Sequence, residues 1–168
     1  MSVVMLSGPV GAGKTTVARE LVAISPAPLC YIEGDTFWPL FAKPDAKSRR
    51  ERFRLLMRSV TAAAVPLARG GYEVLLDFSF PLDFLDTARK IFKEIPLDFV
   101  MLRPSIAICE QRAAARTEGA IADYSVYRDF YPLFEGLPKH EVGDVETDPG
   151  SIARQIREGL DQGAFRLD

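Results

Sequence analysis

The feature that most constrains the fold is a glycine-rich segment close to the start of the chain. Residues 8–15 read Gly-Pro-Val-Gly-Ala-Gly-Lys-Thr, which matches the pattern G-x-x-x-x-G-K-[ST] at every fixed position. The pattern is informative when a β-strand precedes it and an α-helix follows it. An apolar run at 3–6 precedes the segment, and an amphipathic stretch begins at Lys14. The sequence therefore predicts a strand, a tight loop and a helix over residues 3–24.

The residues of this loop are those that hold phosphate groups. Its three glycines allow the backbone to curl with its N–H groups pointing inward, at a helix N-terminus that favours an anion. We expect Lys14 to reach the β- and γ-phosphates of a nucleoside triphosphate, and the Thr15 hydroxyl to ligate Mg²⁺. Thr16 is then expected near the α-phosphate.

Length and composition indicate how many domains the chain has and which kinds of partner are excluded. The 168 residues suffice for one domain with a sizeable core, so a single domain over residues 1–168 is predicted. A net charge of −2 and a hydrophobic content of 48% argue against long nucleic acid as a partner. The N-terminal apolar run is too short for a signal peptide and no stretch approaches a membrane span, so we expect no membrane association. The expected compartment is the cytoplasm, which also supplies ATP.

Apolar runs alternate with helical periodicity along the rest of the chain. Strands are predicted at 3–7, 29–33, 72–77 and 97–102, with a short last strand at 140–145. Helices are predicted at 14–24, 47–68, 83–94, 105–116, 124–135 and 149–159. Strands separated by helices are typical of a parallel sheet covered on both faces. The predicted fold class is therefore α/β, a three-layer P-loop NTPase fold with a parallel five-stranded sheet and helices on both faces.

Two carboxylates fall at the carboxyl ends of predicted strands, the edge at which such sheets bind ligands. Asp77 ends an apolar strand and has the form of a Walker B aspartate, which holds Mg²⁺ directly or through water. Asp35 follows the second strand and suits the acceptor side, where a carboxylate orients a hydroxyl and takes its proton. The alternative for each is an aspartate that only caps or starts a turn.

Arginines form two groups on predicted helices. The first group, spaced every four residues, is Arg50, Arg54 and Arg58. This cationic stripe suits either a solvated helix face, which we favour, or an anionic substrate. Arg112 and Arg116 lie one turn apart, just before the less regular stretch 117–123. Guanidinium groups there suit closure over a triphosphate and stabilisation of charge on the transferring group, or again a solvated face.

In combination these features resemble a known class of enzyme. The N-terminal loop, the aspartates that end two strands and the arginine pair are similar to the small-molecule kinases of the P-loop class, which includes shikimate, gluconate and adenylate kinases. Within that class the chain resembles the chloramphenicol phosphotransferase-like family. The segments that carry this resemblance, in order and spacing, are Pro26-Ala27-Pro28, Gly34-Asp35, Phe53-Arg54, Ala68-Arg69-Gly70-Gly71 and Val74-Leu75-Leu76-Asp77. The resemblance covers about the first two-thirds of the chain and is specific for the fold rather than for the substrate.

The resemblance implies transfer of the γ-phosphate of ATP, with Mg²⁺, to a hydroxyl of a small-molecule acceptor. Asp35 then matches the catalytic base and Arg116 the arginine of a short lid at 117–123, with Lys14 as a third catalytic residue. The predicted nucleotide-binding residues are Gly8, Gly11, Ala12, Gly13, Lys14, Thr15, Thr16 and Arg112, and the predicted metal ligands are Thr15 and Asp77. One departure is that Phe78 and Ser79 follow Asp77, so a second acidic residue of some relatives is missing.

Two other functions stay open at this point. In a nucleoside or nucleoside-monophosphate kinase, the arginine stripe would hold the phosphate of the acceptor. In a nucleotide-binding regulatory switch, hydrolysis would change the shape of the protein, but the chain lacks the N-K-x-D motif of a guanine-specific switch. The aromatic residues that follow the two carboxylates suit an acceptor pocket or the core equally. They are Phe37, Trp38, Phe41 and Phe78.

Overall fold

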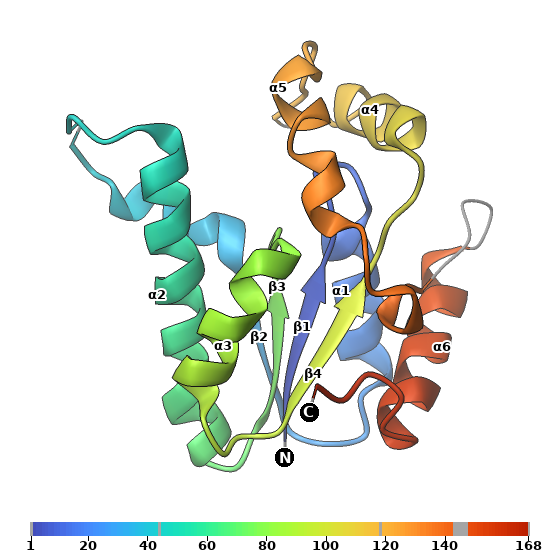
Figure 1. Ribbon diagram of the computed structural model, residues 1–168. Helices are drawn as coiled ribbons and strands as arrows, with labels where there is room; N and C mark the ends of the chain where they lie inside the picture. The colour runs from blue at the N-terminus through green and yellow to red at the C-terminus, as the bar shows by residue number, and fades with distance from the viewer. Residues whose placement is uncertain (1, 44, 118, 143–147, 168) are drawn as a thin grey trace.

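A parallel β-sheet forms the centre of the protein (Figure 1). The computed structural model describes residues 2–43, 45–117, 119–142 and 148–167. The strands are β1 (Val3–Ser7), β2 (Leu29–Glu33), β3 (Glu73–Asp77) and β4 (Leu97–Met101), and they lie in the order β2-β3-β1-β4. All neighbouring strands run parallel. Because β1 lies between β3 and β4, the glycine-rich loop that follows it leaves the sheet at the middle of its carboxyl edge.

Burial explains why these residues form strands. Every residue of β1 and of β4 is buried, as is most of β3, whereas β2 is half-buried along its length because it lies at the sheet edge. Uninterrupted apolar runs of this kind are typical of parallel strands covered on both faces. The predicted positions of these four strands are confirmed to within one residue.

Helices cover both faces of the sheet, as Figure 1 shows. The helices on one face are α2 (Arg49–Arg69) and α3 (Leu85–Phe92), and those on the other face are α1 (Lys14–Ile24) and α6 (Pro149–Asp161). Alternate residues of a strand point to opposite faces. Met5 of β1 therefore packs in the cluster with α2 and α3, and Leu6 packs with α1 and α6. The three-layer α/β arrangement predicted from the sequence is confirmed.

The prediction of a fifth strand is wrong for the described residues, in which the sheet has four strands. His140 ends a 3₁₀ helix, η4 (Pro138–His140), and after it Glu141 makes only an isolated parallel bridge with Met101. The remaining edge of β4 is occupied by the C-terminal segment: the Phe99 N–H donates to the Phe165 carbonyl at 2.9 Å. A fifth strand therefore has no free edge to join along most of β4, and residues 143–145 of the predicted strand lie outside the described residues.

Short helical segments surround the carboxyl edge of the sheet. They are η1 (Gly34–Leu40), η2 (Leu82–Phe84), α4 (Ile106–Ala114), α5 (Ser125–Arg128) and η3 (Tyr131–Phe134). The single helix predicted at 124–135 is thus two short segments, because Pro132 cannot donate the backbone hydrogen bond that a continuous helix requires. The helix predicted at 105–116 ends at Ala114, two residues early. None of the described helices has both the length and the apolar composition that a membrane span requires.

Candidate active site

The glycine-rich loop packs against the two segments beside it more closely than a residue with a side chain permits. Gly8 and Gly11 have φ angles of 150° and 84°, in the region that favours glycine. A Cβ on Gly8 would lie 2.1 Å from the carbonyl oxygen of Leu102, and a Cβ on Gly11 would lie 2.1 Å from that of Cys109. The loop therefore keeps its shape through direct contact with the end of β4 and with α4.

Lys14 bends back over this loop. Its Nζ donates hydrogen bonds to the carbonyl oxygens of Gly8 and Pro9, each at 3.1 Å. Burial lowers the pKa of Lys14, the charges of Asp77 and Asp35 raise it, and the charge of Arg116 lowers it again. The ammonium group is thus within electrostatic reach of both predicted carboxylates and of one predicted arginine.

Asp77 and Thr15 are in direct contact where the loop enters α1. Asp77 ends β3 and is 3% exposed, and its Oδ2 accepts a hydrogen bond of 2.6 Å from the Thr15 hydroxyl. The hydroxyl of Tyr31 donates to the same oxygen at 3.2 Å. Burial raises the pKa of Asp77, while the charge of Lys14 and these two hydrogen bonds lower it. The Asp77 side chain is therefore engaged with the loop and not with its own turn.

The same contact fits a magnesium ion. A carboxylate and a hydroxyl are hard oxygen donors, and Mg²⁺ in phosphate sites is held by one or two such groups, with phosphates and water completing the octahedron. No cluster of three or more His, Cys, Asp or Glu side chains forms a metal site in the described parts of the chain. The donor set of Thr15 and Asp77 therefore fits a phosphate-bound Mg²⁺.

Asp35 lies at the same edge of the sheet, in the first turn of η1 directly after β2. The preceding Gly34 is buried, and a Cβ on it would lie 2.5 Å from the ring of Phe78, which follows Asp77 in the chain. The Asp35 side chain is exposed, and within the described residues no group donates a hydrogen bond to it. Its carboxylate is thus free of the turn, and its charge raises the pKa values of Lys14 and Asp77.

The two predicted arginines reach the loop differently. Arg112, in the last turn of α4, places its Nη1 3.4 Å from the carbonyl oxygen of Ala12. Arg116 follows the end of α4 and is exposed, and its charge acts on the pKa of Lys14. Thr16 is exposed in the first turn of α1. Of the two predicted arginines, Arg112 is therefore the one that contacts the backbone of the loop.

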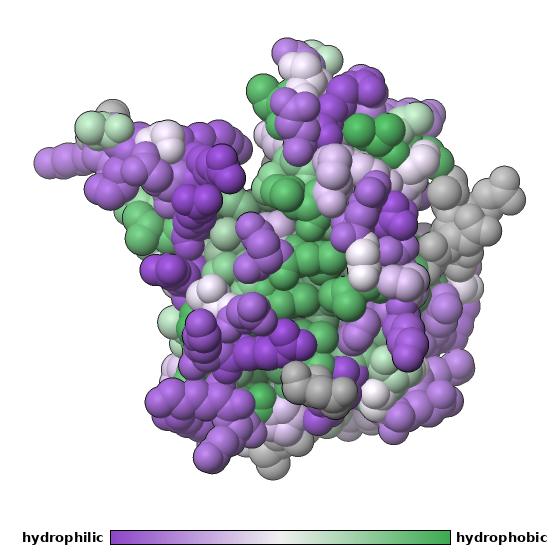
Figure 2. Space-filling model, viewed as in Figure 1, coloured by the Kyte–Doolittle hydropathy of each residue, from purple (hydrophilic) through white to green (hydrophobic). Residues whose placement is uncertain are grey.

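Aromatic rings form a wall between η1, α2 and the segment after α5. The ring centroid of Phe53 lies 6.4 Å from that of Trp38, 5.3 Å from Phe78 and 5.5 Å from Phe130. Phe78 is 2% exposed and belongs to the core, whereas Trp38 is only half-buried. Figure 2 shows a hollow between the projecting N-terminal end of α2 and the α4–α5 region, with apolar surface at its base.

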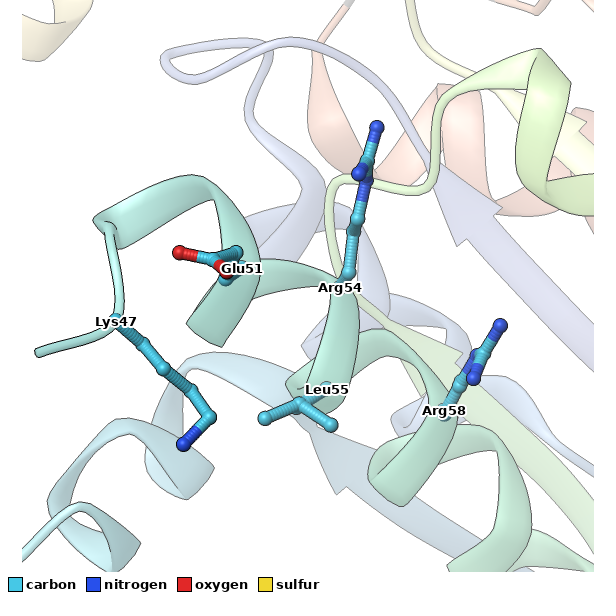
Figure 3. A pocket seen from close by; sticks show the side chains of 5 residues that line it. All are labelled: Lys47, Glu51, Arg54, Leu55 and Arg58. Atoms are coloured by element: carbon cyan, nitrogen blue, oxygen red, sulfur yellow. The ribbon is translucent and has the colours of Figure 1, made fainter.

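A second hollow, of about 260 Å³, lies on the outer side of α2 (Figure 3). It is lined by Lys47, Glu51, Arg54, Leu55 and Arg58. Arg54 and Arg58 project from one flank of the helix, away from Lys47 and Leu55. Both arginines are exposed and neither forms an ion pair with a described residue, which agrees with the solvated face favoured from the sequence.

Two tyrosines at the site had no signal in the sequence. Tyr31 contacts Asp77, as described above, because β2 and β3 lie side by side in parallel. Tyr124 is 1% exposed, and its hydroxyl donates a hydrogen bond of 2.6 Å to the carbonyl oxygen of Val10 in the loop. The partners are separated by 46 and 114 residues, so only the folded arrangement reveals them.

Comparison with known families agrees with this geometry. The family described as chloramphenicol phosphotransferase-like protein matches residues 1–127, which is most of the chain. The chain belongs to the chloramphenicol phosphotransferase-like family. Its members are P-loop kinases, that is, phosphotransferases, so both the resemblance and the enzyme class predicted from the sequence are confirmed. Among curated protein sequences, none matches this chain.

Solved structures share the fold of this family member over nearly the whole chain. A sugar kinase from Janibacter sp. HTCC2649 has a TM-score of 0.74 at 20% identity, covering 96% of this chain and 95% of that one. A gluconokinase from Sinorhizobium meliloti 1021 has a TM-score of 0.71 at 21% identity, covering 97% and 93%. The APS kinase of Mycobacterium tuberculosis, solved in complex with AMPPNP and APS, has a TM-score of 0.72 at 20% identity, covering 95% and 97%. At these identities the likeness establishes the P-loop kinase fold.

Proposed function

We propose that this protein transfers the γ-phosphate of ATP, in the presence of Mg²⁺, to a hydroxyl group of a small-molecule acceptor. The observation that carries the proposal is the contact of Thr15 with Asp77 at 2.6 Å, beside Lys14 and within reach of the charge of Asp35. One edge of the sheet thus combines a phosphate loop, a cation site and a free carboxylate. Membership of a phosphotransferase family supports this assignment.

The nucleotide would occupy the glycine-rich loop. Backbone N–H groups of the loop and of the first turn of α1 would hold the phosphates, with Thr16 beside the α-phosphate. Lys14 would exchange the carbonyl oxygens of Gly8 and Pro9 for oxygens of the β- and γ-phosphates. The similar APS kinase was solved in complex with AMPPNP, which supports a nucleotide as ligand. Thr15 and Asp77 would hold Mg²⁺, which neutralises charge on the phosphates.

The acceptor would lie on the opposite side of the γ-phosphate, in the hollow beside the aromatic wall. Asp35 is exposed and accepts no hydrogen bond from the described residues, so its carboxylate is available to orient an acceptor hydroxyl and to take its proton. Arg112 would cover the phosphates, and Arg116 would stabilise the charge that develops on the transferring group. The short lid predicted at 117–123, of which residue 118 lies outside the described residues, would cover them. We assign these parts to one domain acting in the cytoplasm, where ATP is supplied.

A screen of acceptors tests this function. The purified protein would be incubated with ATP, Mg²⁺ and a panel of sugars, nucleosides, shikimate-like acids and aminocyclitols, while ADP release is followed. We expect at least one acceptor to raise ADP release above the background hydrolysis. ATP binding without stimulation by any acceptor would favour a nucleotide-dependent switch instead, and a preference for nucleoside monophosphates would favour a nucleotide kinase.

The substitution Arg116→Ala tests the proposed role of the lid arginine. We expect kcat to fall by about 10²-fold or more while the Kd for ATP changes little, because the contact strengthens only in the transition state. Steady-state kinetics together with calorimetric titration of ATP separate the two quantities. Arg69→Ala is the matched control, since it removes an exposed arginine at the far end of α2. An unchanged kcat with weaker ATP binding would make Arg116 a ground-state clamp.

A further inference from the structure

A buried tyrosine holds the glycine-rich loop from the side of α4. We infer that Tyr124 is a positioning residue for phosphate binding, because its hydroxyl fixes the orientation of the peptide group between Val10 and Gly11. The inference rests on the proposed function, since it concerns how well the loop is prepared to receive phosphate. It assigns a role to a residue that lies outside the P-loop motif and outside the predicted lid.

The donor of this hydrogen bond is buried. Tyr124 is 1% exposed and packs in a small cluster with Cys109 and Ala113 of α4, against which Val10 also lies. Its ring centroid is 5.3 Å from that of Tyr127. Burial raises the pKa of Tyr124, so the hydroxyl keeps its proton and remains a donor. A hydrogen bond of 2.6 Å from a buried donor is stronger than one made in water.

The hydrogen bond from Tyr124 to the Val10 carbonyl also orients the N–H of Gly11, because both belong to the same peptide group. The peptide is planar and trans, so the carbonyl of Val10 and the N–H of Gly11 point to opposite sides. Because the carbonyl of Val10 is held toward the hydroxyl of Tyr124, the N–H of Gly11 is directed away from that hydroxyl. Within the described residues this N–H makes no hydrogen bond, whereas the next one, of Ala12, donates to Pro9 at 3.2 Å. A free N–H that is fixed in one direction suits an anion.

The hydrogen bond from Tyr124 has a large effect at this position because the peptide group that it holds precedes a glycine, Gly11. Gly11 has a φ of 84°, and glycine accepts a rotation of the adjacent peptide group at little cost. Two other polar side chains contact carbonyls of the loop, Lys14 at Gly8 and Pro9 and Arg112 at Ala12, and Lys14 would leave them for phosphate oxygens when nucleotide binds. The bond from Tyr124 comes from outside the loop and would persist with nucleotide bound. It would therefore act in both the free and the bound enzyme.

The experiment compares Tyr124→Phe with Tyr131→Phe in the full chain. Each change removes one hydroxyl, but the hydroxyl of Tyr131 donates to the carbonyl of Pro104, outside the loop, at 2.7 Å. We expect Tyr124→Phe to raise the Kd of ATP and of ADP about 3- to 10-fold, the effect of one lost hydrogen bond, with kcat at saturating ATP near that of wild type. We expect Tyr131→Phe to bind both nucleotides within about twofold of wild type.

Thermal unfolding with and without ATP separates positioning from general stability. A smaller ATP-induced rise in Tm for Tyr124→Phe than for Tyr131→Phe supports the inference, even if both variants melt below wild type. Equal nucleotide affinities for Tyr124→Phe and wild type would overturn it, as would an equal loss in both variants. Failure of the wild-type protein to bind any nucleotide would instead contradict the proposed function.

Discussion

Replacing Lys14 with alanine is expected to lower acceptor phosphorylation by at least about 10²-fold, the largest effect of any single change in the loop. The reason is that the ammonium group bends back over the loop, where it would meet the charge that develops between the β- and γ-phosphates. The fold should survive, because Lys14 makes its hydrogen bonds to loop carbonyls and none to the core. The measurement is kcat and KM for ATP with a fixed acceptor.

The control for this prediction is Lys90→Ala, which removes the same charge from an exposed position on α3. We expect its kinetics to match those of the wild type. Wild-type turnover in Lys14→Ala would contradict the assignment of the loop as the phosphate site. Circular dichroism of both variants verifies that each one is folded.

Replacing Asp35 with asparagine is expected to reduce acceptor phosphorylation by about 10²- to 10⁴-fold, the usual contribution of a general base. Asparagine keeps the shape of the side chain but cannot take a proton from the acceptor hydroxyl. Because Asp35 lies in η1 and not in the loop, the Kd for ATP and the slow background hydrolysis should change much less. Acceptor-dependent ADP release measures the rate of phosphorylation, and calorimetric titration measures the Kd for ATP.

Asp83→Asn is the matched control, since Asp83 is also an exposed aspartate in the first turn of a 3₁₀ helix, η2. We expect it to phosphorylate the acceptor at the wild-type rate. If Asp35→Asn also works at that rate, Asp35 is only a turn residue and the base is another group. If the acceptor rate and the ATP affinity fall together, the carboxylate acts on nucleotide binding instead.

Local sequence patterns were sufficient for the centre of the fold. The strands β1 and β4 are continuous apolar runs bounded by turn residues, and burial on both faces leaves few other conformations for them. The P-loop motif fixed the start of α1, and the strand ends brought Asp35 and Asp77 to one edge. Their positions follow from the general rule that parallel strands end at a common edge.

Features that depend on distant partners could not be read in this way. A segment around Phe165 occupies the edge of β4. The sequence near residue 140 gives no sign that a distant segment takes the place of the predicted fifth strand. The helix expected at 124–135 has suitable periodicity, but Pro132 and the packing of Phe134 into the core divide it. The contact of Tyr124 with Val10 joins residues whose side chains carry no motif. Such contacts are set by tertiary packing rather than by local propensity.

The position of β1 also has a consequence for the order in which the protein folds. β1 is the first strand of the chain, yet its partners are β3 and β4, so Val3 pairs only with Val74 and Leu97. Ordering these long intervening segments must precede the gain from pairing, which makes sheets of this kind slow to form. The loop after β1 in turn takes its shape from contacts with Leu102 and Cys109. Competence to bind nucleotide should thus appear among the last events of refolding, which makes it a kinetic reporter of the completed sheet.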